Sequence, residues 1–114
     1  MKDTCIEIKY KDKVYHAYFN LNVMEQIQDE FGTLQAWGDM TTAGEEPNAK
    51  AIITGLMYMI NEGIEIDNED NGTKTKPITH KQAGRILTEL GLEQTAQQIN
   101  GLVVDSVSDD AKNE

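Results

Sequence analysis

The change of hydrophobic period along the chain is the feature that most constrains its fold. Between Thr4 and Phe19, apolar residues alternate with polar ones, which is the period of a half-buried β-strand. After Asn22, apolar residues recur at helical spacing in segments that end at glycine. A two-stranded ribbon is marginal in water unless helices cover its apolar face. The sequence therefore predicts an α+β fold in which an N-terminal β-hairpin packs on a small bundle of about four helices.

The alternation also predicts how the two strands of the hairpin pair. A register that puts Ile8 opposite Tyr15 and Ile6 opposite Ala17 gathers the apolar side chains on one face. The polar turn at residues 11–13 contains no Asn-Gly or Asp-Gly pair, so the geometry of the turn stays open.

Caps and glycines set the predicted limits of the helices. Asn22 is the predicted N-cap of the first helix, and Gly63 is the predicted stop of the apolar helix. Thr79 and Gln82 have the spacing of a capping box. We expect the acidic stretch 62–76 to be a mobile surface loop. The helices are predicted over residues 22–31, about 34–37, 48–62, 79–90, and from Leu92 onward.

Length and cysteine content indicate one domain in a reducing compartment. With 114 residues, the chain can build a single core without covalent cross-links. Cys5 is the only cysteine, so no internal disulfide can form, and we expect a cytoplasmic protein. The apolar run 51–60 is too short to cross a bilayer, so we expect no membrane partner. We assign residues 1–105 to the domain and residues 106–114 to an acidic, disordered C-terminal tail.

The charge of the chain argues against nucleic acid as a partner. Ten basic residues and twenty acidic ones give a net charge of −10. Such a chain repels polyanions unless its few cations gather on one face. Acidic residues are interleaved with the lysines near the hairpin, so no basic patch is expected there. Those lysines are Lys2, Lys9, Lys11 and Lys13.

No residue pattern points to catalysis or to a bound metal. The run 67–72 begins like a calcium-binding loop, but the position that needs a bidentate glutamate is Ile78. Cys5 lacks a neighbouring base in the predicted hairpin, where His16 is opposite Glu7. We therefore expect no enzymatic activity, no metal site and no cofactor.

The strongly apolar helix predicted over residues 48–62 is the candidate functional surface. Its apolar residues form two stripes, the first with Ile52, Leu56 and Met59 and the second with Ile53, Met57 and Ile60. One stripe would face the core and the other a protein partner. The alternative is a central core helix that is buried on all sides. Gly55 in its middle would allow a close approach of a neighbouring segment. Methionine suits a partner surface because its flexible thioether adapts to irregular shapes. The candidate protein-binding residues are Ile53, Met57, Tyr58, Ile60 and Trp37.

With these parts in order, the chain resembles the tail assembly chaperones of long-tailed, siphovirus-type phages and prophages of Gram-positive bacteria. The resemblance spans most of residues 15–104. The segments that carry it are 19–27 (FNLNVMEQI), the helix end at 31–32 (FG), 53–58 (ITGLMY) and 78–87 (ITHKQAGRIL).

The resemblance implies a small, non-enzymatic α/β protein that acts during tail morphogenesis. Members of this family are thought to bind the long helical tape measure protein until tail tube subunits polymerise around it. The tape measure protein, and the tail tube protein beside it, are therefore the expected partners. Many members also have a longer, frameshifted form. Residues 111–113 (AKN) are compatible with the slippery codons GCA AAA AAC.

A different class of function stays open at this point. Residues 79–104 can be interpreted as a helix-turn-helix with Gly91 in the turn, which would make the chain a small prophage-encoded regulator or adaptor. The second helix of that unit has glutamines but no cation over residues 93–98, which disfavours DNA reading. The residues leave self-association into a homo-oligomer open as well.

Overall fold

The N-terminal hairpin has the predicted pairing. A computed structural model of the chain describes the backbone of residues 4–42 and 48–112, and the side chains of these residues except 108–112. β1 (Thr4–Tyr10) and β2 (Lys13–Phe19) are antiparallel, with Ile8 opposite Tyr15 and Ile6 opposite Ala17. The turn is only two residues long, and Lys11 takes a left-handed φ of 56° within it, which is uncommon for a lysine.

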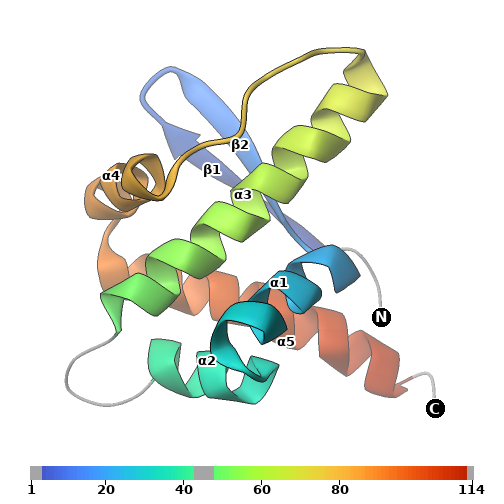
Figure 1. Ribbon diagram of the computed structural model, residues 1–114, viewed down its shortest axis with the longest axis vertical. Helices are drawn as coiled ribbons and strands as arrows, with labels where there is room; N and C mark the ends of the chain where they lie inside the picture. The colour runs from blue at the N-terminus through green and yellow to red at the C-terminus, as the bar shows by residue number, and fades with distance from the viewer. Residues whose placement is uncertain (1–3, 43–47, 113–114) are drawn as a thin grey trace.

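Among the described residues, five helices follow the hairpin, so the chain has the predicted α+β fold (Figure 1). There is one helix more than the predicted number of about four, because the short segment near residue 34 forms a helix of nine residues. The helices are α1 (Leu21–Phe31), α2 (Leu34–Thr42), α3 (Ala49–Asn71), α4 (His80–Leu90) and α5 (Leu92–Lys112). Within the described residues, no helix is long and apolar enough to span a bilayer.

The N-cap of α1 is Asn20 and not Asn22, which corrects the sequence-based prediction. Asn20 has the extended backbone of a cap, and its side chain accepts a hydrogen bond from the Val23 N–H at 3.2 Å. Asn22 lies inside the helix, and its side chain instead donates to Glu62 of α3 at 3.1 Å. The predicted end of α1 at residue 31 is confirmed, and Gly32 follows it with a φ of 91°.

α3 continues past Gly63, so the predicted stop at this glycine is wrong. The backbone of Gly63 lies against the carbonyl group of His16 in β2, and a Cβ at this position would overlap the carbonyl oxygen. The glycine therefore permits close helix–strand packing and does not end the helix. Residues 62–71, predicted as a loop, belong to α3, and Gly72 ends the helix with a left-handed φ of 66°.

The last two helices begin where the sequence predicts. Thr79 forms the expected capping box with Gln82, and Gly91 separates α4 from α5. α5 runs on to Lys112, and Ser106 within it is fully buried. α5 thus continues past residue 105, where the sequence-based division places the end of the domain.

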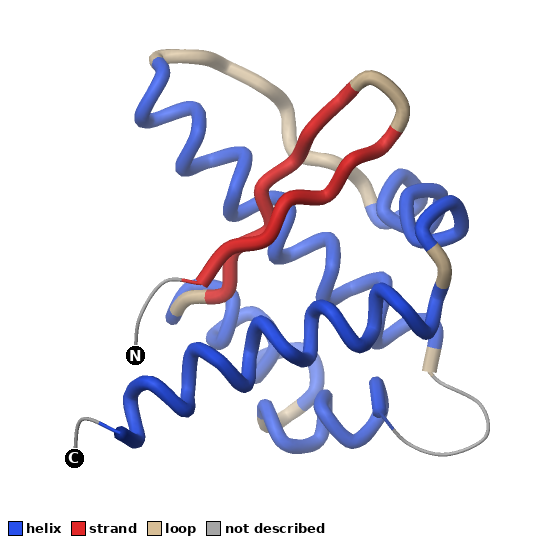
Figure 2. The backbone as a smooth tube through the Cα atoms, turned by 180° about the vertical axis from the view of Figure 1, so that it is seen from behind, coloured by secondary structure: helices blue, strands red, loops and turns tan. Residues whose placement is uncertain are grey.

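α3 is the centre of the fold. In Figure 1 it runs diagonally across the molecule in front of the hairpin, and in Figure 2, seen from behind, the hairpin lies in front of it. α5 contacts β1, where the Thr4 hydroxyl donates to the Leu102 carbonyl at 3.0 Å. One hydrophobic core joins the apolar face of the hairpin to all five helices. Its largest fully buried side chains include Trp37, Phe19, Ile27, Ile52, Leu56, Met59, Ile60 and Ile99.

Candidate protein-binding surface

The apolar helix singled out from the sequence is α3, and most of its circumference is core. Ten of its 23 residues are buried. The first predicted stripe, Ile52, Leu56 and Met59, is fully buried. In the second stripe Ile60 is also fully buried, whereas Ile53 and Met57 are half-buried. α3 is therefore a central helix with one partly open strip along its length.

We call this open part the Met57 strip, which consists of Ile53, Met57 and Tyr58. All three side chains are half-buried and pack on the edge of the core. The positions 53, 57 and 58 lie within about 140° of one another on a helical turn of 3.6 residues. Thr54 and Asn61 lie between Met57 and Tyr58 around the helix, so polar side chains interrupt the apolar strip there.

α4 flanks the Met57 strip on one side. The side chain of Ile53 reaches α4, where a Cβ at Gly84 would lie 3.7 Å from its Cδ1 atom. Next to it, the Thr54 hydroxyl and His80 Nε2 are 3.2 Å apart. About two turns further along α3, Asn61 bonds both the N–H and the carbonyl of Ile78, at 2.7 and 3.1 Å. These bonds fix the start of α4 against α3.

α1 contributes negative charge on the other side of the strip. Partial burial raises the pKa of the Tyr58 phenol, and the carboxylates of Glu30 and Asp29 raise it further. The apolar strip therefore has an acidic border. A ligand that covers it must present apolar side chains to Met57 and neutral or basic groups toward the end of α1.

A polar hollow follows the strip toward the C-terminal end of α3. It has a volume of about 440 Å³ and is lined by α1, α3 and the segment before α4. At its base the buried carboxylate of Glu62 accepts hydrogen bonds from Asn20 at 2.6 Å and Asn22 at 3.1 Å. The carboxylate lies at the N-terminus of α1, where the helix dipole favours a negative charge.

Trp37 and Ile60, the other two candidates from the sequence, belong to the core of this structure. Trp37 is fully buried, and its indole N–H donates to the Ala51 carbonyl at 3.0 Å. The ring lies over Gly55, where a Cβ would come within 2.6 Å of the indole Cζ2 atom. The close approach expected at Gly55 is confirmed, and its neighbour is this ring. We therefore leave Trp37 and Ile60 out of the candidate surface.

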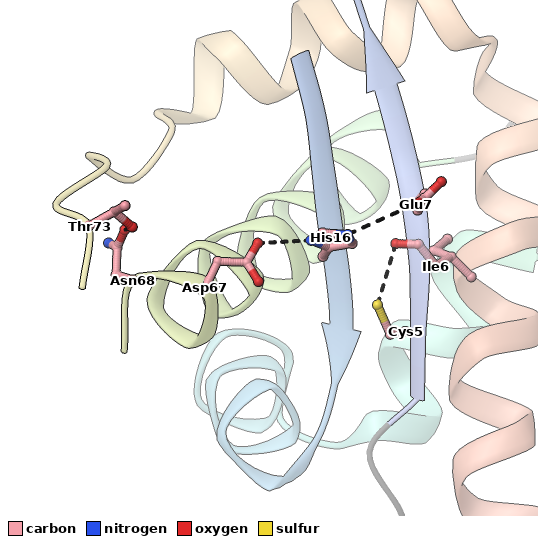
Figure 3. A network of polar contacts seen from close by, with 7 residues as sticks. All are labelled: Cys5, Ile6, Glu7, His16, Asp67, Asn68 and Thr73. Carbon is pink, nitrogen blue, oxygen red and sulfur yellow. Dashed lines mark hydrogen bonds and ion pairs between the residues drawn. The ribbon is translucent and has the colours of Figure 1, made fainter. Parts of the chain in front are cut away.

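The titratable side chains on the outer face of the hairpin form a short chain of contacts (Figure 3). His16 Nδ1 is 2.8 Å from an Asp67 carboxylate oxygen, and His16 Nε2 is 3.9 Å from Glu7. Partial burial raises the pKa of the Cys5 thiol, and the negative charges of Asp67 and Glu7 add to this effect. A hydrogen bond with Tyr18 acts in the opposite direction. A raised pKa lowers the thiolate fraction, so Cys5 is not activated as a nucleophile.

The acidic run that begins like a calcium loop is mostly helical. Residues 67–71 form the last turn of α3, and Asp67 contacts His16, as Figure 3 shows. Asn68 bonds Thr73 and Thr75 of the following segment, at distances of 2.7 to 3.0 Å. Across the described part of the chain, no three His, Cys, Asp or Glu side chains are placed to hold a metal ion.

Several exposed apolar side chains were not identified from the sequence. Val14 lies on the outer face of β2, opposite Lys9, where the alternation predicts a polar residue. These exposed apolar side chains are distributed over four elements, and single exposed apolar residues are common on protein surfaces. Its members are Val14, Leu21, Met40, Val104 and Val107.

The exposed side chains of α5 argue against the helix-turn-helix interpretation. α5 packs against α2, α3, α4 and both strands, which leaves only its outer side for a ligand. That side presents Glu93, Gln94, Gln97, Gln98 and Asp105. Residues 92–107 contain no lysine or arginine, so this face has no cation for a phosphate.

Comparisons of the chain with protein-family models, with curated proteins and with solved structures found no match.

Proposed function

We propose that this protein is a tail assembly chaperone of a siphovirus-type phage or prophage and acts in the cytoplasm of the bacterial host. In this proposal it binds amphipathic helices of the tape measure protein, and also tail tube subunits, while the tail is built. The support from sequence is the resemblance over residues 19–27, 53–58 and 78–87. The function requires no catalytic group.

The observation that carries the proposal is the Met57 strip, a partly exposed apolar surface on the central helix of the fold. An amphipathic helix can lay its apolar face along such a strip, with anchors spaced at three and four residues. The thioether of Met57 can adapt to different side chains along a repetitive partner. The net charge of −10 keeps copies of the chaperone apart while each one covers apolar surface of its partner.

Substitution of Met57 by glutamate tests the proposal. The wild-type protein should keep a co-expressed tape measure protein, encoded downstream in the same gene cluster, in the soluble fraction. Met57→Glu places a charge in the centre of the strip, and we expect the Kd for the tape measure protein to rise about tenfold or more. The measurement is the amount of soluble tape measure protein, followed by a pull-down titration.

Val104→Glu is the matched control, because it introduces the same charge at an exposed apolar residue of α5. This variant should solubilise the partner as well as the wild type does. Circular dichroism should show that both variants are folded. A folded Met57→Glu variant with full solubilising activity would refute the proposal.

The DNA around the gene gives an independent test, since the proposal expects a slippery run at codons 111–113 and an overlapping −1 frame.

A further inference from the structure

Cations that are distant in the sequence lie together at the hairpin end of the molecule. Lys11, Lys13 and Arg85 line a hollow of about 280 Å³ between the hairpin and α4. Lys13 also lines an adjoining hollow of about 720 Å³, together with Lys76 from the segment after α3. The two hollows share Tyr15 and Gln82, and we call them together the basic groove.

The groove is positive although the protein as a whole is strongly acidic. Its four cations are accompanied by two carboxylates, Asp12 and Asp67, and Asp67 is engaged by His16 at 2.8 Å. The sequence predicts no basic patch, because acidic residues are interleaved with the hairpin lysines. The tertiary structure changes the balance of positive and negative charges near the hairpin, because it brings Lys76 and Arg85 there from elsewhere in the chain.

One wall of the groove is the outer edge of β2. The sheet in the described residues has two strands, so this edge of β2 has no neighbouring strand. The His16 carbonyl points toward Gly63 of α3, and hence away from β1. Because inward and outward residues alternate in an antiparallel pair, Val14 also directs its N–H and carbonyl away from β1. α3 covers the edge at His16, whereas Val14 borders the larger hollow.

The remaining lining suits an extended chain. Residues 75–79, which are neither helix nor strand, line the larger hollow together with residues 13–16 of β2. Its floor includes the half-buried Tyr15 and the buried side chains of Ile64 and Ile78. Alternate side chains of an extended ligand would point to this apolar floor and to the charged rim.

We propose that the basic groove binds an extended, acidic segment of a partner polypeptide, which pairs with the edge of β2 at Val14. Its carboxylates contact Lys13 and Lys76, and its backbone bonds the outward N–H and carbonyl of Val14. A second copy of this chain is disfavoured as the occupant, because both copies carry a charge of −10. This surface is distinct from the Met57 strip, so the inference does not depend on the proposed function.

Fluorescence anisotropy with labelled peptides tests the charge requirement. A ten-residue peptide of alternating glutamate and threonine should bind the full-length protein at low salt, and its lysine–threonine counterpart should not. Lys76→Glu should weaken binding at least about fivefold, since it turns an attraction at the rim into a repulsion. Lys50→Glu is the matched control, because Lys50 is an exposed lysine at the start of α3 that lines neither hollow.

Val14→Pro tests the backbone pairing. Proline removes an N–H that points away from β1, so the hairpin should fold while peptide binding weakens. Val14→Thr keeps the N–H and should bind like the wild type. If Val14→Pro unfolds the protein, the backbone pairing is tested with a modified peptide instead. Methylation of alternate backbone nitrogens of the peptide should abolish its binding to the wild-type protein.

Three results would overturn the inference. One is the absence of binding of the acidic peptide below millimolar concentration. The second is equal binding by the Lys76→Glu and Lys50→Glu variants. The third is Lys76-dependent binding of a single-stranded oligonucleotide without binding of the peptide, which would assign the groove to nucleic acid. Met57→Glu should leave peptide binding unchanged, which separates this test from that of the proposed function.

Discussion

At the scale of single residues, two glycines of α3 have functions that depend on their neighbours. Gly55 makes room for the Trp37 ring, and Gly63 makes room for the backbone of β2. In an isolated helix each would only reduce stability relative to alanine. Their close contacts instead let α3 approach α2 and the hairpin, which is how one helix can serve as the centre of a small domain.

Gly63→Ala should therefore destabilise the protein by about 3 kcal/mol or more, because the obstructing group is a backbone carbonyl that cannot rotate away. Gly101→Ala is the matched control in α5, where nothing lies within 4 Å of the added Cβ. The free energy of unfolding of that variant should increase by about 1 kcal/mol, because alanine has a higher helix propensity than glycine. Urea denaturation measures the free energy of unfolding of both variants. Equal stability of the two variants would contradict the close packing of α3 on β2.

Thr95 offers a second test at this scale. Its side chain is fully buried, and its hydroxyl has no hydrogen-bond partner in the described structure. Thr95→Val keeps the shape and removes the unsatisfied hydroxyl, so the free energy of unfolding should increase by about 1 kcal/mol. Thr88→Val is the control, because the exposed Thr88 hydroxyl donates to the Gly84 carbonyl at 2.8 Å. A loss of stability in Thr95→Val would show that its hydroxyl is bonded.

At the scale of elements, polar side chains of α3 determine where the neighbouring elements begin. Glu62 binds the residues that open α1, and Asn61 binds the residue before the N-cap of α4. Asn68 holds the segment that follows α3. These contacts position α1 and α4 on the two sides of the Met57 strip, so the strip depends on them for its borders.

Glu62→Ala should loosen α1, because it leaves the amides of Asn20 and Asn22 without their acceptor. We expect a loss of about 1 to 3 kcal/mol in the free energy of unfolding, with faster hydrogen exchange in the first turn of α1. Glu65→Ala removes an exposed carboxylate one turn later and should change stability by less than about 0.5 kcal/mol. Unchanged exchange in α1 after Glu62→Ala would show that other contacts hold this helix.

At the scale of the whole molecule, apolar and charged surfaces are separated. The Met57 strip has an acidic border from α1, whereas the cations of the hairpin, α4 and the segment between α3 and α4 line the basic groove. A protein with a flat body of 36 × 36 × 23 Å can thus present two surfaces of different chemistry. Met57→Glu should consequently weaken binding of the tape measure protein, and Lys76→Glu should weaken binding of the acidic peptide.

The sequence by itself determined the local features of this protein. The period-two alternation specified the hairpin and its register, and Thr79, Gly32 and Gly91 specified helix limits, because these signals act between residues close in the chain. The sequence also identified Ile53, Met57 and Tyr58 as apolar residues on the helix that carries the candidate surface.

Only the tertiary structure decided which side chains are covered and which glycines end a helix. Gly63 resembles a helix stop in sequence, but its role is set by His16, 47 positions earlier. Trp37 lies in the core because its ring packs over Gly55 of α3, and Ile60 lies on the buried side of the same helix. The basic groove exists because Lys76 and Arg85 fold back onto the hairpin. Burial and charge density are sums over spatial neighbours, and the order of residues along the chain does not contain them until the chain is folded.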